Sequence, residues 1–168
     1  MALNKPAGWA YVSATPVAAD GNRIVFTGTQ IDLALDSHVA APLFALVKYP
    51  PPHTGLNPTL GVNLDRAASI RGRAASALLD QRVQEAQTHA GAKFEVVQPV
   101  TTLTLAGHPG ARVVLRAPGD VPALLTIVNL VVDDTTFMFA SAGAETGADA
   151  ANVEFEQILQ SLVIEGRR

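Results

Sequence analysis

The sequence predicts an α+β fold in which helices flank a central, mainly antiparallel sheet. Two segments repeat apolar residues at helical spacing, and most of the remaining chain divides into short β-prone runs. Short connections between these runs favour antiparallel pairing, because a parallel pair needs a crossover of a dozen or more residues. The order of the elements also lacks the regular βαβ alternation that builds a parallel sheet.

The length and composition of the chain are those of one globular domain, residues 1–168. Hydrophobic residues make up 48% of the sequence and charged residues 16%, which excludes the disordered class. The net charge of −3 provides no electrostatic footprint for nucleic acid, and no apolar run is long enough to span a bilayer. The absence of cysteine excludes disulfides and thiolate catalysis.

The first residues of the chain lack the continuous apolar core of a signal peptide. We therefore expect a cytoplasmic protein. The alternative is an exported or envelope protein whose signal peptide has been removed.

The first half of the chain contains short runs of high β propensity, separated by Gly, Asp-Ser or Pro. They span residues 23–28, 31–35 and 43–49. The triplet Asp20-Gly21-Asn22 is a strong turn signal before the first run. Farther along, Leu60, Val62 and Leu64 alternate with small or polar residues, which predicts a half-buried strand.

Two amphipathic helices are predicted. The first covers about residues 74–89, where apolar residues such as Leu79 and Val83 follow helical spacing. Its polar face indicates that it covers one side of a sheet. The second helix lies near the C-terminus, with an apolar stripe around Phe155, and residues 163–164 after it are interpreted as a short closing strand.

Four strands are predicted between the two helices. They span residues 94–105, 111–116, 124–132 and 135–142. Pro99 in the first of them indicates an edge position or a bulge, since proline cannot donate a hydrogen bond to a neighbouring strand. Turns are predicted at residues 107–110, 118–120 and 133–134.

Four motifs in a fixed order extend along nearly the whole chain. They are Pro6-Ala7-Gly8-Trp9, Asn57-Pro58-Thr59-Leu60-Gly61-Val62, Leu105-Ala106-Gly107-His108-Pro109-Gly110-Ala111-Arg112 and Phe155-Glu156-Gln157-Ile158-Leu159-Gln160-Ser161-Leu162. Together they resemble the Mog1/PsbP-like superfamily, which includes bacterial PsbP- and DcrB-like domains. The resemblance implies an α/β/α sandwich around a central antiparallel sheet. It also implies no shared enzymatic activity, because the known members act mostly through protein contacts.

No catalytic, metal-binding or cofactor-binding residue is predicted. The histidines are widely spaced and have no carboxylate at metal-ligand spacing. Asp36, Ser37 and His38 are the residue types of a catalytic triad, but adjacent positions cannot converge in that geometry. Asp133 and Asp134 are interpreted as turn residues rather than as paired catalytic carboxylates. We therefore expect a protein that is not an enzyme and needs no cofactor.

The strongest interaction candidate is the loop that contains three consecutive prolines. The prolines restrict the backbone, so presenting Tyr49 and His53 to a partner would cost little conformational entropy. Tyr49, Pro51 and His53 are therefore candidate binding residues. The structural alternative is a rigid connector that sets the angle between two strands.

These observations favour a non-catalytic protein-interaction or chaperone-like module of bacterial type. The expected partner is another protein. A related chaperone family on this fold captures apolar helices of secreted proteins, so the resemblance implies an apolar segment as the specific partner. A large exposed apolar patch on the sheet would favour this hypothesis. Two alternatives stay open: a small-ligand-binding protein or enzyme with a pocket between sheet and helix, and a structural component that self-assembles through an edge strand.

Overall fold

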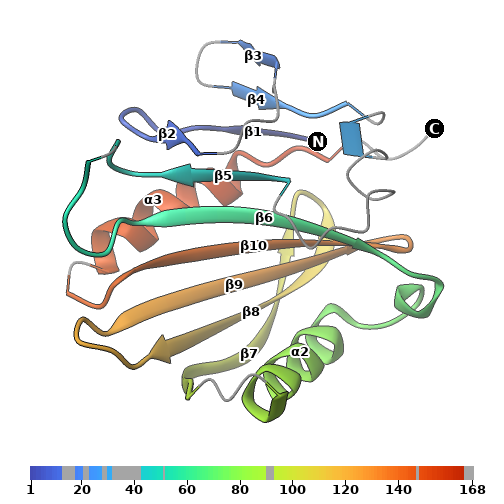
Figure 1. Ribbon diagram of the computed structural model, residues 1–168. Helices are drawn as coiled ribbons and strands as arrows, with labels where there is room; N and C mark the ends of the chain where they lie inside the picture. The colour runs from blue at the N-terminus through green and yellow to red at the C-terminus, as the bar shows by residue number, and fades with distance from the viewer. Residues whose placement is uncertain are drawn as a thin grey trace.

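The computed structural model describes residues 1–12, 18–20, 23–27, 30–31, 43–50, 52–89, 93–146 and 148–164. These residues form a seven-stranded sheet, a three-stranded sheet and two α-helices (Figure 1). Every strand runs antiparallel to the strands beside it. The predicted α+β class with a mainly antiparallel sheet is therefore confirmed.

The seven-stranded sheet has the strand order β2-β5-β6-β10-β9-β8-β7. Its strands are β2 (Ala10–Tyr11), β5 (Phe44–Val47), β6 (Thr59–Arg66), β7 (Glu95–Leu105), β8 (His108–Ala117), β9 (Ala123–Val132) and β10 (Thr135–Ala144). β7 to β10 are joined as consecutive hairpins. β6 pairs with β10, although an α-helix and three strands lie between them in the sequence. The antiparallel pairing predicted from the short connections is therefore present in these strands.

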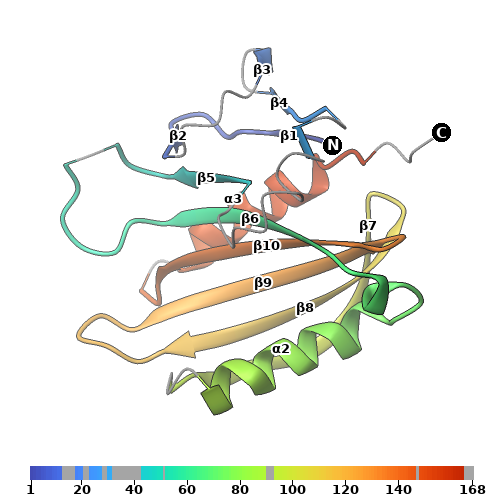
Figure 2. The same ribbon diagram turned by 45° about the vertical axis from the view of Figure 1, so that its right-hand side comes forward.

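The two helices lie on opposite faces of this sheet (Figures 1 and 2). α2 (Ala75–His89) follows a short 3-10 helix, η1 (Ala68–Ile70), and packs over β7, β8 and β9. α3 (Ala148–Gln160) packs on the other face, against β10 and against β1 (Ala2–Asn4) of the smaller sheet. The predicted sandwich is thus confirmed. Neither α2 nor α3, the helices of the described residues, is long and apolar enough to cross a membrane.

Hydrophobic side chains form a core on each side of the large sheet. The main core lies between this sheet, α3 and the smaller sheet, where Phe44, Phe139 and Phe155 are fully buried. A second core lies under α2 and contains Leu79 and Val113. α2 covers β7, β8 and β9 on one face of the sheet and α3 covers β10 on the other, so each helix buries the strands beneath it on its own face.

The smaller sheet is an element that the sequence analysis did not predict. Its order is β1-β4-β3, with β3 at Ala18–Asp20 and β4 at Arg23–Val25. Two backbone hydrogen bonds of 2.8 Å join Ala2 to Val163, in the segment after α3. The closing strand predicted at residues 163–164 is reduced to this single bridge.

The strand predicted over residues 31–35 is wrong at its first residue. The N–H of Ile31 donates a hydrogen bond to the carbonyl oxygen of Thr27 at 3.1 Å, which is a helical pairing four residues back along the chain. Residues 32–35, and with them the triplet 36–38, lie outside the described residues.

The turn predicted at residues 107–110 is shorter than expected. β8 begins at His108, and the connection consists of Ala106 and Gly107, whose φ angles of 51° and 78° suit a two-residue hairpin. Gly110 therefore lies inside a strand. A Cβ atom there would meet Cδ2 of Leu130 at 2.6 Å, so close strand packing, and not a turn, requires this glycine.

Pro99 confirms the interpretation of an edge strand with a bulge. β7 is the last strand of the large sheet. Its pairing with β8 shifts register between Val96 and Gln98 and again between Gln98 and Thr101. A bulge at an exposed edge accommodates a residue that cannot donate to the neighbouring strand.

Candidate functional site

The proline loop is closed at its base by Asn57. The backbone N–H of Tyr49 donates to Oδ1 of Asn57 at 3.0 Å, and Nδ2 of Asn57 donates to the carbonyl oxygen of Tyr49 at 2.7 Å. The N–H of Lys48 also donates to the carbonyl oxygen of Pro58 at 2.9 Å. One amide side chain therefore fixes the two ends of the loop, which accounts for the asparagine of the Asn57-Pro58 motif.

Two of the three predicted loop residues lie together. The rings of Tyr49 and His53 stack with centroids 4.8 Å apart, and both side chains are exposed. The ammonium group of Lys48 lies 5.9 Å from the Tyr49 ring centroid, within range of a cation–π contact. The third candidate, Pro51, lies outside the described residues.

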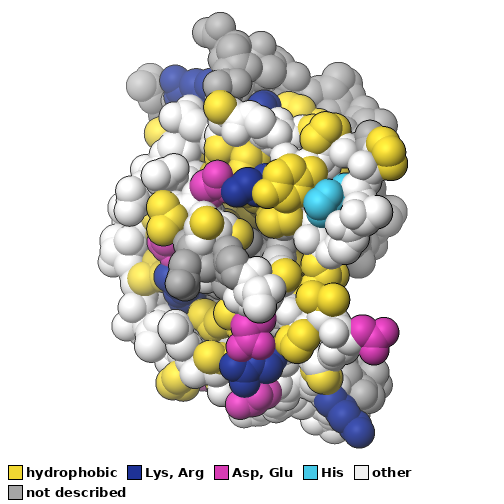
Figure 3. Space-filling model, turned by 90° about the vertical axis from the view of Figure 1, so that its left-hand side faces the viewer, with side chains coloured by type: hydrophobic (Ala, Val, Ile, Leu, Met, Phe, Trp, Pro, Cys, Tyr) yellow, Lys and Arg dark blue, Asp and Glu magenta, His cyan; other side chains and the backbone are white. Residues whose placement is uncertain are grey.

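Glu154 of α3 connects this loop to the main core. Its Oε2 atom forms an ion pair with Nζ of Lys48 at 2.8 Å and accepts a hydrogen bond from Nε1 of Trp9 at 3.3 Å. Trp9 is buried, and Nζ of Lys5 donates to its carbonyl oxygen at 2.8 Å. Figure 3 shows acidic, basic, apolar and histidine side chains following one another across this end of the molecule. Since Glu154 neutralises Lys48, the loop presents an aromatic stack rather than a charge.

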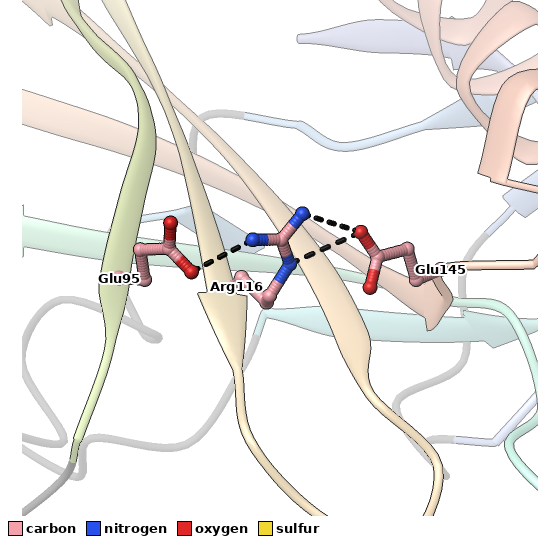
Figure 4. A network of polar contacts seen from close by, with 3 residues as sticks. All are labelled: Glu95, Arg116 and Glu145. Carbon is pink, nitrogen blue, oxygen red and sulfur yellow. Dashed lines mark hydrogen bonds and ion pairs between the residues drawn. The ribbon is translucent and has the colours of Figure 1, made fainter.

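A second polar network lies at the same end of the molecule (Figure 4). Arg116 of β8 contacts Glu145 through Nη2 at 2.5 Å and Nε at 3.0 Å, and Glu95 of β7 through Nη1 at 2.7 Å. The hydrogen bonds and charge of Glu145, and then those of Glu95, raise the pKa of the Arg116 guanidinium. Arg116 binds two carboxylates, so the network links β7, β8 and the segment before α3.

Metal-ligand clusters and the cavity beside α2 are the first places to look for a chemical site among the described residues. No three His, Cys, Asp or Glu side chains in the described ranges gather in a way that could hold a metal ion. A cavity of about 430 Å³ does lie between the start of α2 and strands β7 and β8. The described residues that line it include Arg73, Ser76, Thr102 and Thr104 but no carboxylate or histidine, so this cavity lacks a general acid–base group.

A cross-strand row of small and apolar residues extends beyond α2 on the same face of the sheet. Ile127 packs against the core under α2 and pairs with Ala140, which pairs with Gly61, which pairs with Ala45. A Cβ atom built on Gly61 would meet nothing within 4 Å. The row therefore passes from covered to open surface within the width of the sheet.

The neighbouring rows extend this surface, which we call the open face. It comprises the apolar residues Ala45, Val47, Gly61, Met138, Ala140 and Ala142 and also the polar residues Thr59 and Asn63, which pair with Ala142 and Met138 on the same rows; all are half-buried. In Figure 1 this side of the sheet is turned toward the viewer, and β5, β6 and β10 lie beyond α2. Arg82 of α2 borders the open face, with Nη1 3.4 Å from Sδ of Met138 and Nη2 2.9 Å from Oδ2 of Asp65. Sequence alternation predicts two faces for each strand, but only the position of α2 reveals which part stays uncovered.

Asn129 is an unusual polar residue in the core beside the open face. It pairs with Met138 and is fully buried, yet neither Nδ2 nor Oδ1 has a hydrogen-bond partner among the described residues. Oγ1 of Thr136, on the next row, is also unpartnered. Such groups destabilise a core by the cost of their desolvation.

The comparisons with known proteins identify the fold. No protein-family model and no curated protein matches the chain. LpqN of Mycobacterium tuberculosis, involved in cell envelope biogenesis, has 12% identity and a TM-score of 0.61 over 94% of this chain and 79% of its own. Cyanobacterial PsbP from Synechocystis has 15% identity and a TM-score of 0.56 over 95% and 84%. The Pseudomonas aeruginosa protein PA94, of unknown function, has 11% identity and a TM-score of 0.58 over 73% and 83%. The described chain has the Mog1/PsbP-like fold.

Proposed function

We propose that this chain, with its Mog1/PsbP-like fold, is a non-catalytic protein-interaction module of bacterial, chaperone-like type that binds an apolar helix of a partner protein. The observation that carries the proposal is the open face, a largely apolar part of the sheet beside α2 that neither described helix covers. Exposed apolar surface that continues a buried core is typical of docking sites.

The width of the open face fits one helix. It extends across β5, β6 and β10, and strands lie about 4.8 Å apart, so the three strands span roughly 10 Å. An α-helix with its side chains is about 10–12 Å wide. A partner helix would therefore lie beside α2 and complete the layer that α2 begins over β7, β8 and β9.

The side chains of the open face favour close approach of such a helix. Gly61 and Ala140 form its centre and leave space for the large apolar residues of a partner, while Val47 and Met138 border them. The Arg82–Asp65 ion pair supplies a polar rim on one side. An apolar centre with a polar rim is the usual arrangement of a protein interface.

A lysine introduced at Gly61 tests this proposal. The probe is a fluorescent 15-residue amphipathic peptide, equal in length to α2, with leucine on one side and glutamine on the other. We expect Gly61→Lys to weaken its binding at least tenfold, because a charged side chain would stand in the path of the helix. Fluorescence anisotropy measures the binding, and circular dichroism verifies folding.

The matched control is Val153→Lys, since Val153 is 57% exposed on α3, on the opposite side of the sheet. We expect this variant to bind the peptide like the wild type. Equal binding by Gly61→Lys and wild type, or equal binding of a scrambled peptide of the same composition, would reject the open face as the docking site.

The aromatic stack of the proline loop is a second binding candidate. The contacts of Asn57 and Glu154 support the alternative role of a rigid connector, because both stabilise the base of the loop. Comparing partner recovery by wild type with that by the double variant Pro51→Ala/His53→Ala separates the two roles. Unchanged recovery would leave the loop a connector.

Self-assembly through a sheet edge is the alternative that we favour least. Pro99 and the two register shifts of β7 oppose regular pairing with a second copy. Light scattering at high protein concentration tests this, and an oligomer that persists on dilution would revive the alternative.

Two cellular locations are considered for this protein. We propose the cytoplasm for the chain as it stands, and the envelope as the alternative. The similarity to LpqN, a protein involved in cell envelope biogenesis, supports the alternative. Cell fractionation of the full gene product decides between them.

A further inference from the structure

A cavity of about 750 Å³ lies between the smaller sheet and the β9–β10 end of the large sheet. Its volume is in the range of small-molecule binding sites. Residues of β1 and β4 line one side, and the β9–β10 hairpin and the segment after α3 line the other. Phe137, which belongs to the main core, also lines it, so the cavity and the open face lie on opposite faces of the large sheet.

Apolar side chains form the inner walls of this cavity. They include Val25, Phe26, Val132, Phe137 and Ile164. Water in contact with such walls is unfavourable, and a ligand that replaces it with an alkyl chain gains free energy in proportion to the area buried.

Charged side chains also line the cavity, with an excess of positive charge among the described residues. Three arginines, Arg23, Arg66 and Arg71, and two aspartates, Asp133 and Asp134, belong to the described lining, which leaves one positive charge in excess among these residues. The whole chain, in contrast, carries a net charge of −3. An anionic group is therefore favoured at this position over a cationic one.

One exposed arginine of the lining, Arg71, is only loosely paired. Nη2 of Arg71 lies 3.6 Å from Asp134, and the same carboxylate lies 3.4 Å from Nε of Arg66. Charge-assisted hydrogen bonds of this type are usually about 2.7–2.9 Å long. The Lys48–Glu154 pair, at 2.8 Å, meets that length. The Arg71 side chain is 73% exposed, so it can bind a further anion without losing a strong partner.

We propose that this cavity binds an amphiphile with a single alkyl chain and a carboxylate head group. The alkyl chain lies against Phe26 and Phe137, and the carboxylate lies at Arg71 and Arg23. This ligand matches both halves of the lining, whereas a wholly polar anion would leave the apolar walls in contact with water.

Calorimetric titration with hexanoate, octanoate and decanoate, below their micellar concentrations, tests the proposal. Each step of two methylenes should tighten binding about fifteenfold, as expected for an alkyl chain that becomes buried. Heptyltrimethylammonium, which has the same alkyl chain as octanoate but a positive head group, should bind at least tenfold more weakly than octanoate.

Two arginine variants locate the head group. Arg71→Met should weaken octanoate binding about tenfold and leave octanol binding unchanged, because one charge-assisted bond is lost. Arg73→Met is the matched control, since Arg73 lies outside this cavity and its Nη2 bonds to Gln81 at 2.9 Å. Arg23→Met repeats the test from the other side of the cavity.

Affinity that is independent of chain length would overturn the proposal. So would equal effects of Arg71→Met and Arg73→Met, or equal binding of the cationic amphiphile. Circular dichroism of each variant verifies that the chain is folded, which is expected because the Arg71 side chain is mostly exposed.

Discussion

Replacing Gly110 by alanine should destabilise the protein through the packing of β8 against β9. Gly110 lies directly opposite Leu130. The added methyl group would lie 2.6 Å from Cδ2 of Leu130, 2.9 Å from the carbonyl oxygen of Asn129 and 3.0 Å from Cδ1 of Leu103. A rotation of Leu130 would relieve the first contact, but the carbonyl belongs to β9, so the two strands must separate locally.

The expected loss of stability follows from these contacts. Overpacking of a core costs about 1–3 kcal/mol, and the contact with the backbone oxygen places Gly110→Ala in the upper half of that range. A loss of about 2 kcal/mol would lower the melting temperature by roughly 4–8 °C in a chain of this size. Urea unfolding followed by circular dichroism measures the change.

Gly61→Ala is the matched control, because the methyl group there meets nothing within 4 Å. We expect its free energy of unfolding to stay within about 0.5 kcal/mol of the wild type or to rise slightly. A double-mutant cycle with Leu130→Val should show a coupling energy, since the shorter side chain removes one of the clashes. Equal stability of Gly110→Ala and Gly61→Ala would refute the packing argument.

Three further predictions concern single residues. Asn57→Ala should lower the free energy of unfolding by about 1 kcal/mol and speed hydrogen exchange at the amide of Tyr49, because both hydrogen bonds at the loop base are lost. Asn129→Val should raise the free energy of unfolding by about 1 kcal/mol, since it removes two unpartnered buried polar atoms; a decrease would indicate that they bind buried water. Burial raises the pKa of Tyr11 above its ordinary 10.0, so in a Tyr49→Phe variant the absorbance at 295 nm should titrate above that pH. The stability that this shift confers is complete below pH 10 and falls as the pH rises through the raised pKa, and a midpoint at or below 10.0 would contradict it.

The larger elements could be predicted from periodicity and turn chemistry. α2, α3 and the strands from β6 to β10 appear where the patterns place them, with ends that differ by a few residues. The prediction for Pro99 also holds, because the missing N–H is a local property of that residue. These predictions depend only on residues that are close in the sequence, so packing between distant segments does not change them.

The smaller sheet and the exact hairpin turn could not be predicted in the same way. β1 and β3 have three residues each, so pairing with β4, and for β1 also packing on α3, stabilises them more than intrinsic propensity does. In the sequence, Gly110 is typical of a turn. In the structure, a glycine is required there because Leu130, twenty residues away, leaves no space for a Cβ atom.

The candidate surfaces were accessible to sequence analysis only in part. The proline loop predicts Tyr49 and His53 as binding residues, and these two residues do lie together. The open face depends on how far α2 extends over the sheet, and the cavity depends on the folding that brings Arg23 and Arg71 to one lining. No local pattern encodes either arrangement.

The most direct test of the proposed docking function is an NMR titration of the isotope-labelled protein with the amphipathic peptide. We predict that the largest amide shift changes fall on β5, β6 and β10, with Ala45, Gly61 and Ala140 among them, and that the same titration of Gly61→Lys shows none. Shift changes confined to residues 49–53 and 57, or spread evenly over the chain, would contradict it.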